Sequence, residues 1–393
     1  MTADGVLSGF RVIDMCHGLA GPSATRILAG LGADVIKIEM PGTGEFTRQV
    51  VPYVFRSHNR DKRSIAVDLK SPRGLALVRR LVATSDVFVQ SQRPGMVASL
   101  GLDQPAVTAL NPRIICASIT GFGEQGPDSP RKSVDMLAQA ESGMAIAQSG
   151  LIGNLSFVDG AAGLSLANGI LAALMRRMRD GQVQHVSLSL LDTAIYLQSA
   201  PLAEFSATGT WIDQTRYWNR YATVGLFDTA DGQIFIAAYW DRDWEAMCGL
   251  LGRPELATDP RFAGNAARAS HAQEVRSMLS AGFAGWRRGE LIAELEGRGI
   301  MAGAVRTYAE VLDSPQVAAN GSFLADTGGD GMTTLFPKVP FRMSPDDRPP
   351  SRPAPPVGDA TLPILRELGL AQDEIAGLLE SKVVTAQPDR RLA

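Results

Sequence analysis

The chain has 393 residues, which is longer than one hydrophobic core usually grows, so we expect two domains or one large domain with an insertion. Hydrophobic residues make up 45% and charged residues 20%, a balance typical of globular proteins and not of disordered or fibrous ones. The net charge of -3 without a long basic run argues against nucleic acid or an anionic membrane as a partner.

The cysteines, the histidines and the first residues indicate the thiol state, the metal content and the cellular location of the protein. Cys16, Cys116 and Cys248 are odd in number and widely spaced, so we expect reduced, mostly buried thiols. The four histidines are equally scattered, and we therefore expect no metal site. The first residues have no signal-peptide pattern and no run of about 20 apolar residues occurs, which predicts a cytoplasmic protein.

The first half alternates β-branched runs with helical stretches. Strands are predicted at FRVIDM (10–15), ADVIKIE (33–39), SIAVDL (64–69), DVFVQ (86–90) and RIICASI (113–119). Helices are predicted at ATRILAGLG (24–32) and after SPRG (71–74). This alternation predicts an α/β fold with a mostly parallel sheet covered by helices.

The block at 159–181 predicts a long buried helix that starts just after Asp159, because small and apolar residues fill it and basic residues precede Gly181. HVSLSLLDTAIYLQSA (185–200) predicts a strand running into another helix. The polar, aromatic stretch 208–222 then breaks the pattern, and we place a domain boundary there.

A second, smaller domain is expected from about residue 223. LFDTADGQIFIAAYW (226–240) predicts a hairpin whose Asp231–Gly232 pair suits a tight turn. Amphipathic helices are predicted at 242–252, 272–286 and 289–299. The proline-rich segment 345–356 is predicted to be a semi-rigid connector to two short C-terminal helices.

Two places carry candidate chemistry. At the expected start of the long helix, the Asp159 carboxylate can accept backbone N–H groups and stay ionised at neutral pH, which makes it a competent nucleophile. Taken alone, these residues favour a plain helix cap, because aspartate is among the commonest caps. In the turn at 17–22, Gly18 and Gly21 let a phosphate approach the backbone, and Pro22 suits a first helical turn. The G-x-G-x-x-G fingerprint of NAD-binding proteins is missing there.

Collinear blocks resemble the family III CoA-transferases, whose superfamily includes formyl-CoA transferase, carnitine CoA-transferase and α-methylacyl-CoA racemase. The blocks in the first half are GFRVIDMCHGLAGPSATRILAGLGADVIKIEMPGTGEFTR, NRDKRSIAVDLKSPRG, RPGMVASLGL, NPRIICASITGFGEQGP, DMLAQAESGM, VDGAAGLSLANGILAALMRR and VSLSLLD. WNRYA, LFDTADGQIFIAA, LLGRPELATDPRF and SPQVAANG follow in the second half. The resemblance covers nearly the whole chain.

The resemblance implies a Rossmann-like large domain at 1–210, a smaller α+β domain at 223–325, a segment at 326–393 that returns to the large domain, and an interlocked homodimer. It implies that Asp159 is the catalytic residue and that coenzyme A is bound as substrate without a metal. The residues at the positions of the family's CoA site are His17, Gly18, Leu19, Ala20, Val67, Lys70 and Lys132.

The sequence also departs from the family. Ser91 and Gln92 replace an Asn-Phe pair that contacts the nucleotide, so the adenine pocket is expected to differ. No counterpart of the glycine-rich loop of formyl-CoA transferase occurs near residues 237–244, which argues against formate and oxalate. Val134 replaces the histidine base of the racemases, and a valine cannot move a proton.

We therefore expect a CoA-transferase that works through an aspartyl mixed anhydride and an aspartyl-CoA thioester. A thioester hydrolase, a racemase or epimerase and a non-catalytic acyl-CoA binding protein are the alternatives. The acid pair is open, and Trp218, Arg220, Tyr239 and Trp240 are candidates to line its pocket. An arginine there would suit a dicarboxylate, and a surface or dimer-contact arginine is the alternative.

Overall fold

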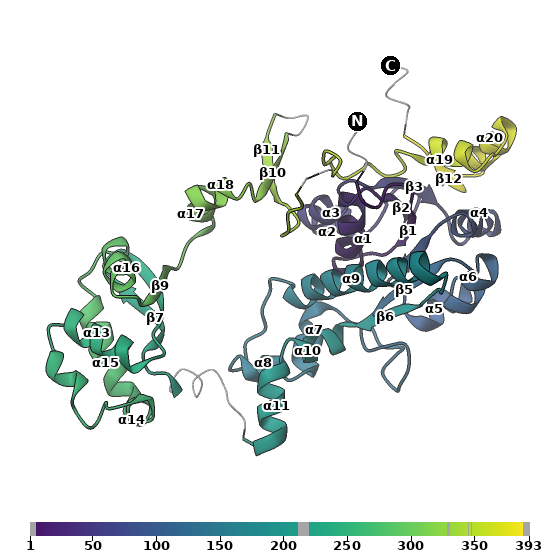
Figure 1. Cartoon of the computed structure of the whole chain (residues 1–393). Coiled ribbons are helices and arrows are strands. Elements are labelled where there is room, and N and C mark those ends of the chain that lie inside the picture. The colour runs from purple at the N-terminus through teal and green to yellow at the C-terminus, as the bar shows by residue number, and fades with distance from the viewer. Residues whose placement is uncertain (1–4, 211–219, 328–330, 345, 347, 388–393) are drawn as a thin grey trace. The chain divides into compact units, whose positions relative to one another are not determined.

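The computed structural model describes residues 5–210, 220–327, 331–344, 346 and 348–387. The chain divides into two compact units, each with its own core (Figure 1). Unit 1 comprises Met1–Met144, Ile152–Ser199 and Phe323–Ala393, and unit 2 comprises Ala145–Leu151 and Ala200–Ser322.

Unit 1 is built on a seven-stranded sheet of order β12-β3-β2-β1-β4-β5-β6. All neighbouring strands are parallel except β12, which runs antiparallel to β3. The strands are β1 (Arg11–Met15), β2 (Asp34–Glu39), β3 (Arg63–Val67), β4 (Val87–Gln90), β5 (Ile115–Thr120), β6 (Val186–Ser189) and β12 (Val384–Thr385). The predicted α/β class, parallel sheet and first-half strands are thereby confirmed.

Helices cover both faces of this sheet, because side chains of alternate strand residues point to opposite sides. Val12 and Val89 pack with one set of helices, whereas Ile13 and Phe88 pack with the other. The first set is α1 (Ala20–Gly30), α9 (Phe157–Asp180) and α10 (Leu190–Tyr196). The second is α4 (Pro72–Ala83), α5 (Pro94–Ser99), α6 (Gln104–Leu110), α19 (Thr361–Glu367) and α20 (Gln372–Glu380).

Unit 1 also contains shorter elements. They are α2 (Thr47–Val50), α3 (Pro52–His58), α7 (Asp135–Glu141) and the hairpin β10 (Phe323–Thr327) and β11 (Thr333–Pro337). Two further short helices, α8 (Met144–Ala147) and α11 (Ser199–Thr208), lie almost entirely in unit 2.

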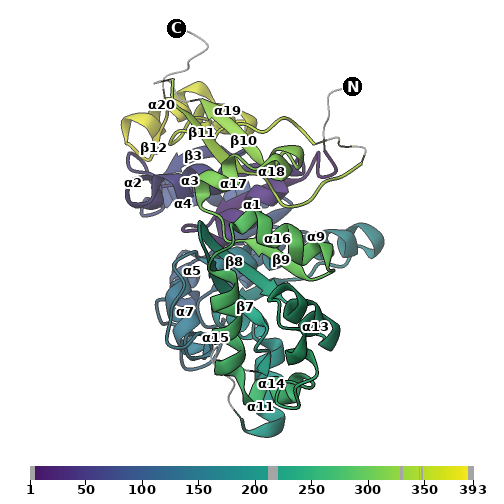
Figure 2. The ribbon, with the colours of Figure 1, turned by 90° about the vertical axis from the view of Figure 1, so that its left-hand side faces the viewer.

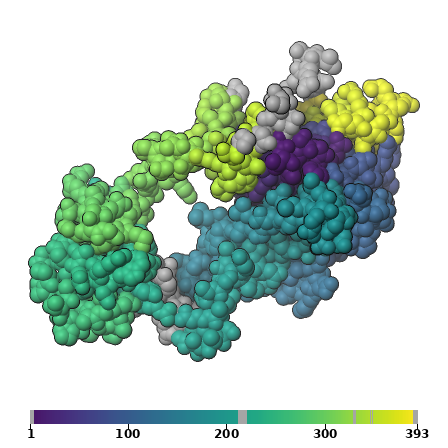
Figure 3. Space-filling view, viewed as in Figure 1, coloured from purple at the N-terminus to yellow at the C-terminus, as the bar shows by residue number. Residues whose placement is uncertain are grey.

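The C-terminal segment lies against the first strands of unit 1. Val384 of β12 pairs with Val67 of β3, and the hydroxyl of Thr361 accepts the backbone N–H of Ala66 at 3.2 Å. Figures 1 and 2 both show α19 and β12 beside β3, and Figure 3 shows this yellow segment packed on the blue part of the chain. Residues about 300 positions apart thus share one core.

Unit 2 contains the predicted hairpin and amphipathic helices. Its sheet has the order β7-β8-β9, and Thr229 pairs with Gly232, so the turn consists of Ala230 and Asp231, with Gly232 opening β8. The elements are β7 (Val224–Thr229), β8 (Gly232–Ala237), α13 (Asp241–Leu250), the 3-10 helix η1 (Pro254–Ala257), α14 (Asn265–Ser270), α15 (Ala272–Phe283), α16 (Arg288–Gly297), β9 (Met301–Ala304), α17 (Tyr308–Leu312) and α18 (Pro315–Ala319).

The long helix α9 is the centre of the first core. It is long and apolar enough by composition to cross a membrane, but Val158, Leu166 and Ile170 are fully buried in unit 1, as in the core helix of a globular protein. It packs closely on α1 at Gly163, where a Cβ would lie 2.8 Å from the carbonyl oxygen of Ala20. Only glycine allows this approach.

We expect Gly163→Ala to lower the free energy of unfolding by about 1–3 kcal/mol, because the added methyl group would meet backbone that cannot move away easily. Gly160→Ala is the matched control on the same helix, since nothing lies within 4 Å of its Cβ position; there the lower backbone entropy of alanine should leave stability unchanged or raise it by about 0.5–1 kcal/mol. Urea denaturation of the two variants measures the difference. Equal midpoints would contradict the close packing of α1 and α9.

Candidate active site

The sheet of unit 1 has a point at which its strand order reverses. The chain adds β2 and β3 on one side of β1 and then crosses to β4 and β5 on the other. In open α/β sheets, ligands bind at such a point, outside the carboxyl ends of the strands. Here the loops after β1 and β4 meet, and they carry His17, Ser91 and Gln92.

His17 is held by the loop after β4. Its backbone N–H donates to Ser91 Oγ at 3.0 Å, and its ring Nδ1 lies 3.2 Å from the side-chain amide nitrogen Nε2 of Gln92. Because that nitrogen is only a donor, Nδ1 accepts and the ring proton of the neutral imidazole sits on Nε2. Loss of water around the ring lowers the pKa of His17, which favours this neutral form.

A buried ion pair supports the turn that carries His17. Glu45 Oε1 accepts the N–H of Gly18 at 2.9 Å, and Lys37 Nζ contacts Glu45 Oε2 at 2.5 Å and the carbonyl oxygen of Cys16 at 2.8 Å. Burial alone would lower the pKa of Lys37, but the charges of Asp14 and Glu45 outweigh it and raise the pKa above its usual value. The sequence analysis did not identify Glu45 or Lys37 as parts of the site.

The start of α1 follows this turn. Leu19 precedes the helix and Ala20 is its first residue, and no side chain among the described residues caps this end. Helix starts of this kind offer free N–H groups to anions. The N–H of Gly18 is already taken by Glu45, so a phosphate at this turn would use the backbone of Leu19 and Ala20.

The remaining residues at CoA-site positions differ in exposure. Val67 ends β3, pairs with Val384 of β12 and is 1% exposed as a whole residue, so it presents almost no surface to a ligand. Lys70 lies exposed in the turn after β3, and Lys132 lies exposed in the segment after β5. The carboxyl ends of parallel strands share one edge, which places Lys70 and His17, just after β3 and β1, along the same edge of the sheet.

Asp159 lies in the first turn of α9, and the predicted helix start was wrong by three residues. The helix begins at Phe157, after Ser156 with φ 49° and ψ 42°, and Asp159 is the third helical residue. Its carboxylate makes no capping hydrogen bond in the described part of the chain. The side chain that accepts a hydrogen bond from this helix start is that of Asp135 instead.

Asp135 anchors the start of α9 from the first turn of α7. Its Oδ2 accepts the backbone N–H of Asp159 at 2.8 Å, and its Oδ1 accepts the side-chain amide of Gln139. The same Gln139 side chain exchanges two hydrogen bonds of 2.8 Å with the backbone of Gly153. Asp135 and Gln139 are buried, and they fix both the segment that leads into α9 and the position of Asp159.

This arrangement changes the electrostatic expectation for Asp159. The sequence analysis expects helix N–H groups to keep the carboxylate ionised, but burial and the neighbouring Asp135 charge raise the pKa of Asp159 to about 7. Both effects disfavour the ionised form. At neutral pH the side chain is therefore present in comparable ionised and protonated populations.

Asp159 also lies close to the turn at the switch point. It is four residues before Gly163, so the two share one face of α9. Gly163 contacts the backbone of Ala20, the first residue after the turn that carries His17. The start of α9 and the start of α1 therefore converge, with Asp159 one helical turn away from their contact.

Other candidate residues lie around this centre or in unit 2. Val134 immediately precedes α7, is 61% exposed and provides no titratable group. In unit 2, Tyr239 contacts Trp240 edge to face at 6.1 Å, and Arg220 forms an ion pair with Glu204 at 2.9 Å. Trp218 lies outside the described residues. Within the described ranges, no group of three or more His, Cys, Asp or Glu side chains is arranged to hold a metal ion.

Comparisons with known proteins show which family the chain resembles. The family model of CoA-transferase family III matches residues 7–361. The succinate–glutarate CoA-transferase of Agrobacterium fabrum is 35% identical over 92% of this chain and 95% of its own length, and the succinyl-CoA:glutarate CoA-transferase of Mus musculus is 33% identical over 96% and 90%. A crystal structure of a CAIB/BAIF family protein from Brucella suis has a TM-score of 0.83 and 32% identity, covering 93% of this chain and 100% of that chain.

Replacement of Asp135 tests the electrostatic coupling. We expect Asp135→Asn to lower the pKa of Asp159, because asparagine can still accept the N–H of Asp159 but no longer opposes its ionisation with a charge. Carbon-detected NMR titration of the aspartate carboxyl groups, assigned with Asp159→Asn, measures the shift. An unchanged titration of Asp159 in the variant would show that burial alone sets its pKa.

Proposed function

Since the chain belongs to CoA-transferase family III, we propose that it moves CoA from an acyl-CoA thioester to a free carboxylic acid with Asp159 as the nucleophile. The observation that carries this proposal is the position of Asp159, held by Asp135 beside the turn at the topological switch point. A carboxylate fixed at a ligand crevice is what covalent acyl transfer requires.

The proposed reaction has two symmetrical halves. Ionised Asp159 attacks the thioester carbonyl, the carbon–sulfur bond breaks, and CoA leaves as thiolate, which gives a mixed anhydride of Asp159 and the acyl group. The thiolate then attacks the acyl carbon of Asp159, which releases the first acid as carboxylate and leaves an aspartyl-CoA thioester. The acceptor carboxylate repeats these steps in reverse and regenerates ionised Asp159.

Asp135 has two effects in this mechanism. Its hydrogen bond to the backbone N–H of Asp159 holds the nucleophile in place without using either carboxylate oxygen of Asp159. Its charge raises the pKa of Asp159, so a smaller fraction is ionised at neutral pH but the ionised group is more basic and more nucleophilic. We infer that Asp135 acts by positioning and electrostatics rather than by proton transfer.

We propose that CoA lies along the carboxyl edge of the sheet. The Nε2–H of neutral His17 can donate to an oxygen of the ligand, and the free N–H groups of Leu19 and Ala20 can bind a phosphate. Lys70 is exposed along the same edge and Lys132 in the segment after β5, and both can pair with phosphate oxygens. The N–H of Gly18 is already bound by Glu45 and Val67 is 1% exposed, so His17, Leu19, Ala20 and the two lysines are the residues that support CoA as the substrate.

We propose a dicarboxylate pair as the first acids to test. Two relatives with more than 30% identity carry succinate or succinyl-CoA and glutarate in their names. In this chain the Arg220 guanidinium is paired with Glu204, so a dicarboxylate that bound Arg220 would have to compete with that ion pair.

We further propose a cytoplasmic, interlocked homodimer, with unit 2 as the smaller α+β domain. An apolar stripe on the outer face of α9 supports association, because Met175 and Met178 are 71% and 70% exposed. On α10, Tyr196 is 77% exposed. Apolar surface of this kind usually marks an interface.

We expect Asp159→Asn to lower the transfer rate from succinyl-CoA to glutarate by at least about a thousandfold, because the amide has no nucleophilic carboxylate. The side chain of Asp159 makes no hydrogen bond among the described residues, so folding should be preserved. Mass spectrometry of glutaryl-CoA formation measures transfer. Asp180→Asn, at the exposed end of the same helix, is the control and should retain full activity.

Parallel reactions without glutarate separate transfer from thioester hydrolysis, since hydrolysis needs no acceptor acid. A donor and acceptor matrix that includes acetyl-CoA then defines the acids. Substantial turnover by pure Asp159→Asn protein would remove Asp159 from the mechanism, and succinate release independent of acceptor would identify a hydrolase.

We expect no racemisation of a chiral 2-methylacyl-CoA. Racemisation needs proton-transfer groups on both faces of the α-carbon, and Val134 has none. Asp159 alone would take and return a proton on one face, which preserves configuration. Incubation in deuterated water followed by chiral analysis is the test, and a thioester that is both labelled and epimerised would favour a racemase.

A further inference from the structure

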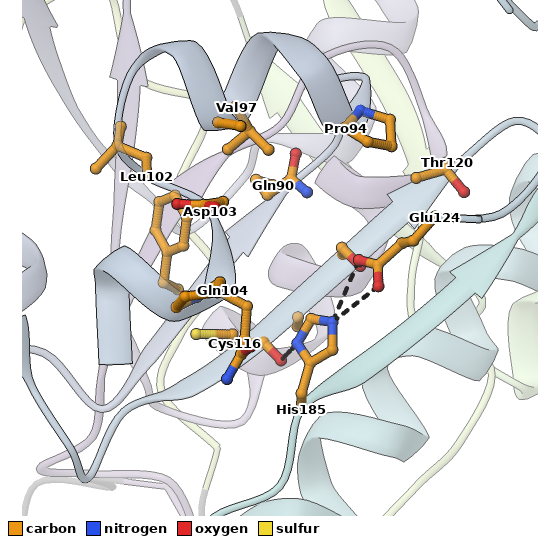
Figure 4. Close-up of a pocket in the computed structure, with 15 residues that line it drawn as sticks. Gln90, Pro94, Val97, Leu102, Asp103, Gln104, Cys116, Thr120, Glu124 and His185 are labelled. Atoms are coloured by element: carbon orange, nitrogen blue, oxygen red, sulfur yellow. Dashed lines mark hydrogen bonds and ion pairs between the residues drawn. The ribbon is translucent and has the colours of Figure 1, made fainter. Parts of the chain in front are cut away.

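A cavity, which we call the second cavity to distinguish it from the proposed active site, lies on the other face of the sheet from α1 and α9. It has a volume of about 260 Å³ and is formed by β4, β5, the start of β6 and helices α5 and α6 (Figure 4). Its side chains belong to alternate strand positions, such as Phe88 and Cys116, which pack with the second core rather than with α9. It is therefore separate from the place of Asp159.

One buried side chain in this cavity has unused hydrogen-bonding capacity. Gln90 is 7% exposed, and its Oε1 accepts the backbone N–H of Gln92 at 2.6 Å. This bond fixes the amide orientation, because an amide nitrogen cannot accept. The Nε2 group donates to no partner within the described residues and faces the cavity. This nitrogen is not among the fully buried side-chain atoms that lack a partner, so it is open to the cavity and can donate to a ligand oxygen there.

The polar side chains on the opposite side of the cavity already have hydrogen-bond partners within the protein. His185 Nδ1 lies 2.9 Å from the carbonyl oxygen of Cys116, and its Nε2 lies 3.2 Å from Glu124 Oε1. Ser118 Oγ donates to the same Glu124 oxygen at 2.5 Å. Figure 4 shows His185 and Glu124 joined by these contacts at one side of the cavity. They form a wall rather than free ligand-binding groups.

Asp103 supplies the complementary group. It precedes α6, but its side chain makes no capping hydrogen bond and lines the cavity instead. Phe88 and Leu102, 2% and 1% exposed, give the same cavity an apolar wall. The free features are thus one donor pair, one carboxylate acceptor and an apolar surface beside an aromatic ring.

We propose that this cavity binds a small, uncharged carboxamide or lactam carried on a flat ring. Its carbonyl oxygen would accept from Gln90 Nε2, its N–H would donate to Asp103, and its ring would pack on Phe88 and Leu102. An anion is disfavoured, because Asp103 and Glu124 both line the cavity. The site is independent of the reaction proposed for Asp159.

The test uses nicotinamide as probe and nicotinate as matched control, since they differ only in the replacement of the amide by a carboxylate. Calorimetric titration of the full chain, with saturating CoA present, is expected to detect nicotinamide and to show at least about tenfold weaker binding of nicotinate. Gln90→Glu retains the acceptor for Gln92 N–H but loses the donors, and it should weaken nicotinamide binding by at least about tenfold.

Two further variants serve as controls, one for effects remote from the cavity and one for misfolding of Gln90→Glu. Gln372→Glu makes the same chemical change on α20, at the opposite end of the sheet, and should leave binding unchanged. Ala98→Trp, at an exposed position of α5 that lines the cavity, should block binding even if Gln90→Glu fails to fold. Absence of nicotinamide binding, equal affinity for nicotinate, displacement by CoA or unchanged binding in Ala98→Trp would each overturn the proposal.

Discussion

The hydrogen bond from the backbone N–H of Asp159 to the Asp135 carboxylate determines where α9 begins. A helix start leaves several N–H groups without partners, and here a side chain from a different helix supplies one acceptor. The preceding Ser156 adopts a left-handed conformation, which is costly for a residue with a side chain and needs support from its surroundings. Asp135, Gln139 and Gly153 provide that support, so the geometry of the proposed nucleophile depends on a buried polar network rather than on its own helix.

The same contact has an electrostatic cost. A neutral acceptor at position 135 would satisfy the N–H of Asp159 without raising the pKa of its carboxyl group. The carboxylate that is present both orders the helix start and opposes ionisation of the neighbouring side chain. A nucleophile that forms and then breaks an acyl bond benefits from this compromise, because a very weakly basic carboxylate attacks slowly and a fully protonated one does not attack.

Local sequence patterns predicted most of the large unit but not the polar contacts of the site. The strands β1 to β5 follow from β-branched runs, whereas the contact of His17 with Ser91 depends on the strand order, which the runs do not specify. The predicted start of α9 was wrong, because it depends on Asp135, 24 residues earlier in the chain. The predicted pKa direction of Asp159 was wrong, because burial of its carboxyl group and, second, the charge of Asp135 raise the pKa. Lys37 and Glu45 were not identified for the same reason: isolated charged residues do not reveal that they will be buried together.

The strand β4 shows how one short segment serves two sides of the sheet. Val87 and Val89 pack into the core that contains α1 and α9, whereas Phe88 and Gln90 face the second cavity. The loop that follows holds His17 through Ser91 and Gln92, and the N–H of Gln92 is in turn bound by Gln90. Because side chains alternate with a period of two, the Gln90 side chain reaches the turn at the switch point through the Gln92 backbone. The backbone of Gln90 also pairs with Met15, two residues before His17, so β4 links two sites whose side-chain environments lie on opposite faces of the sheet.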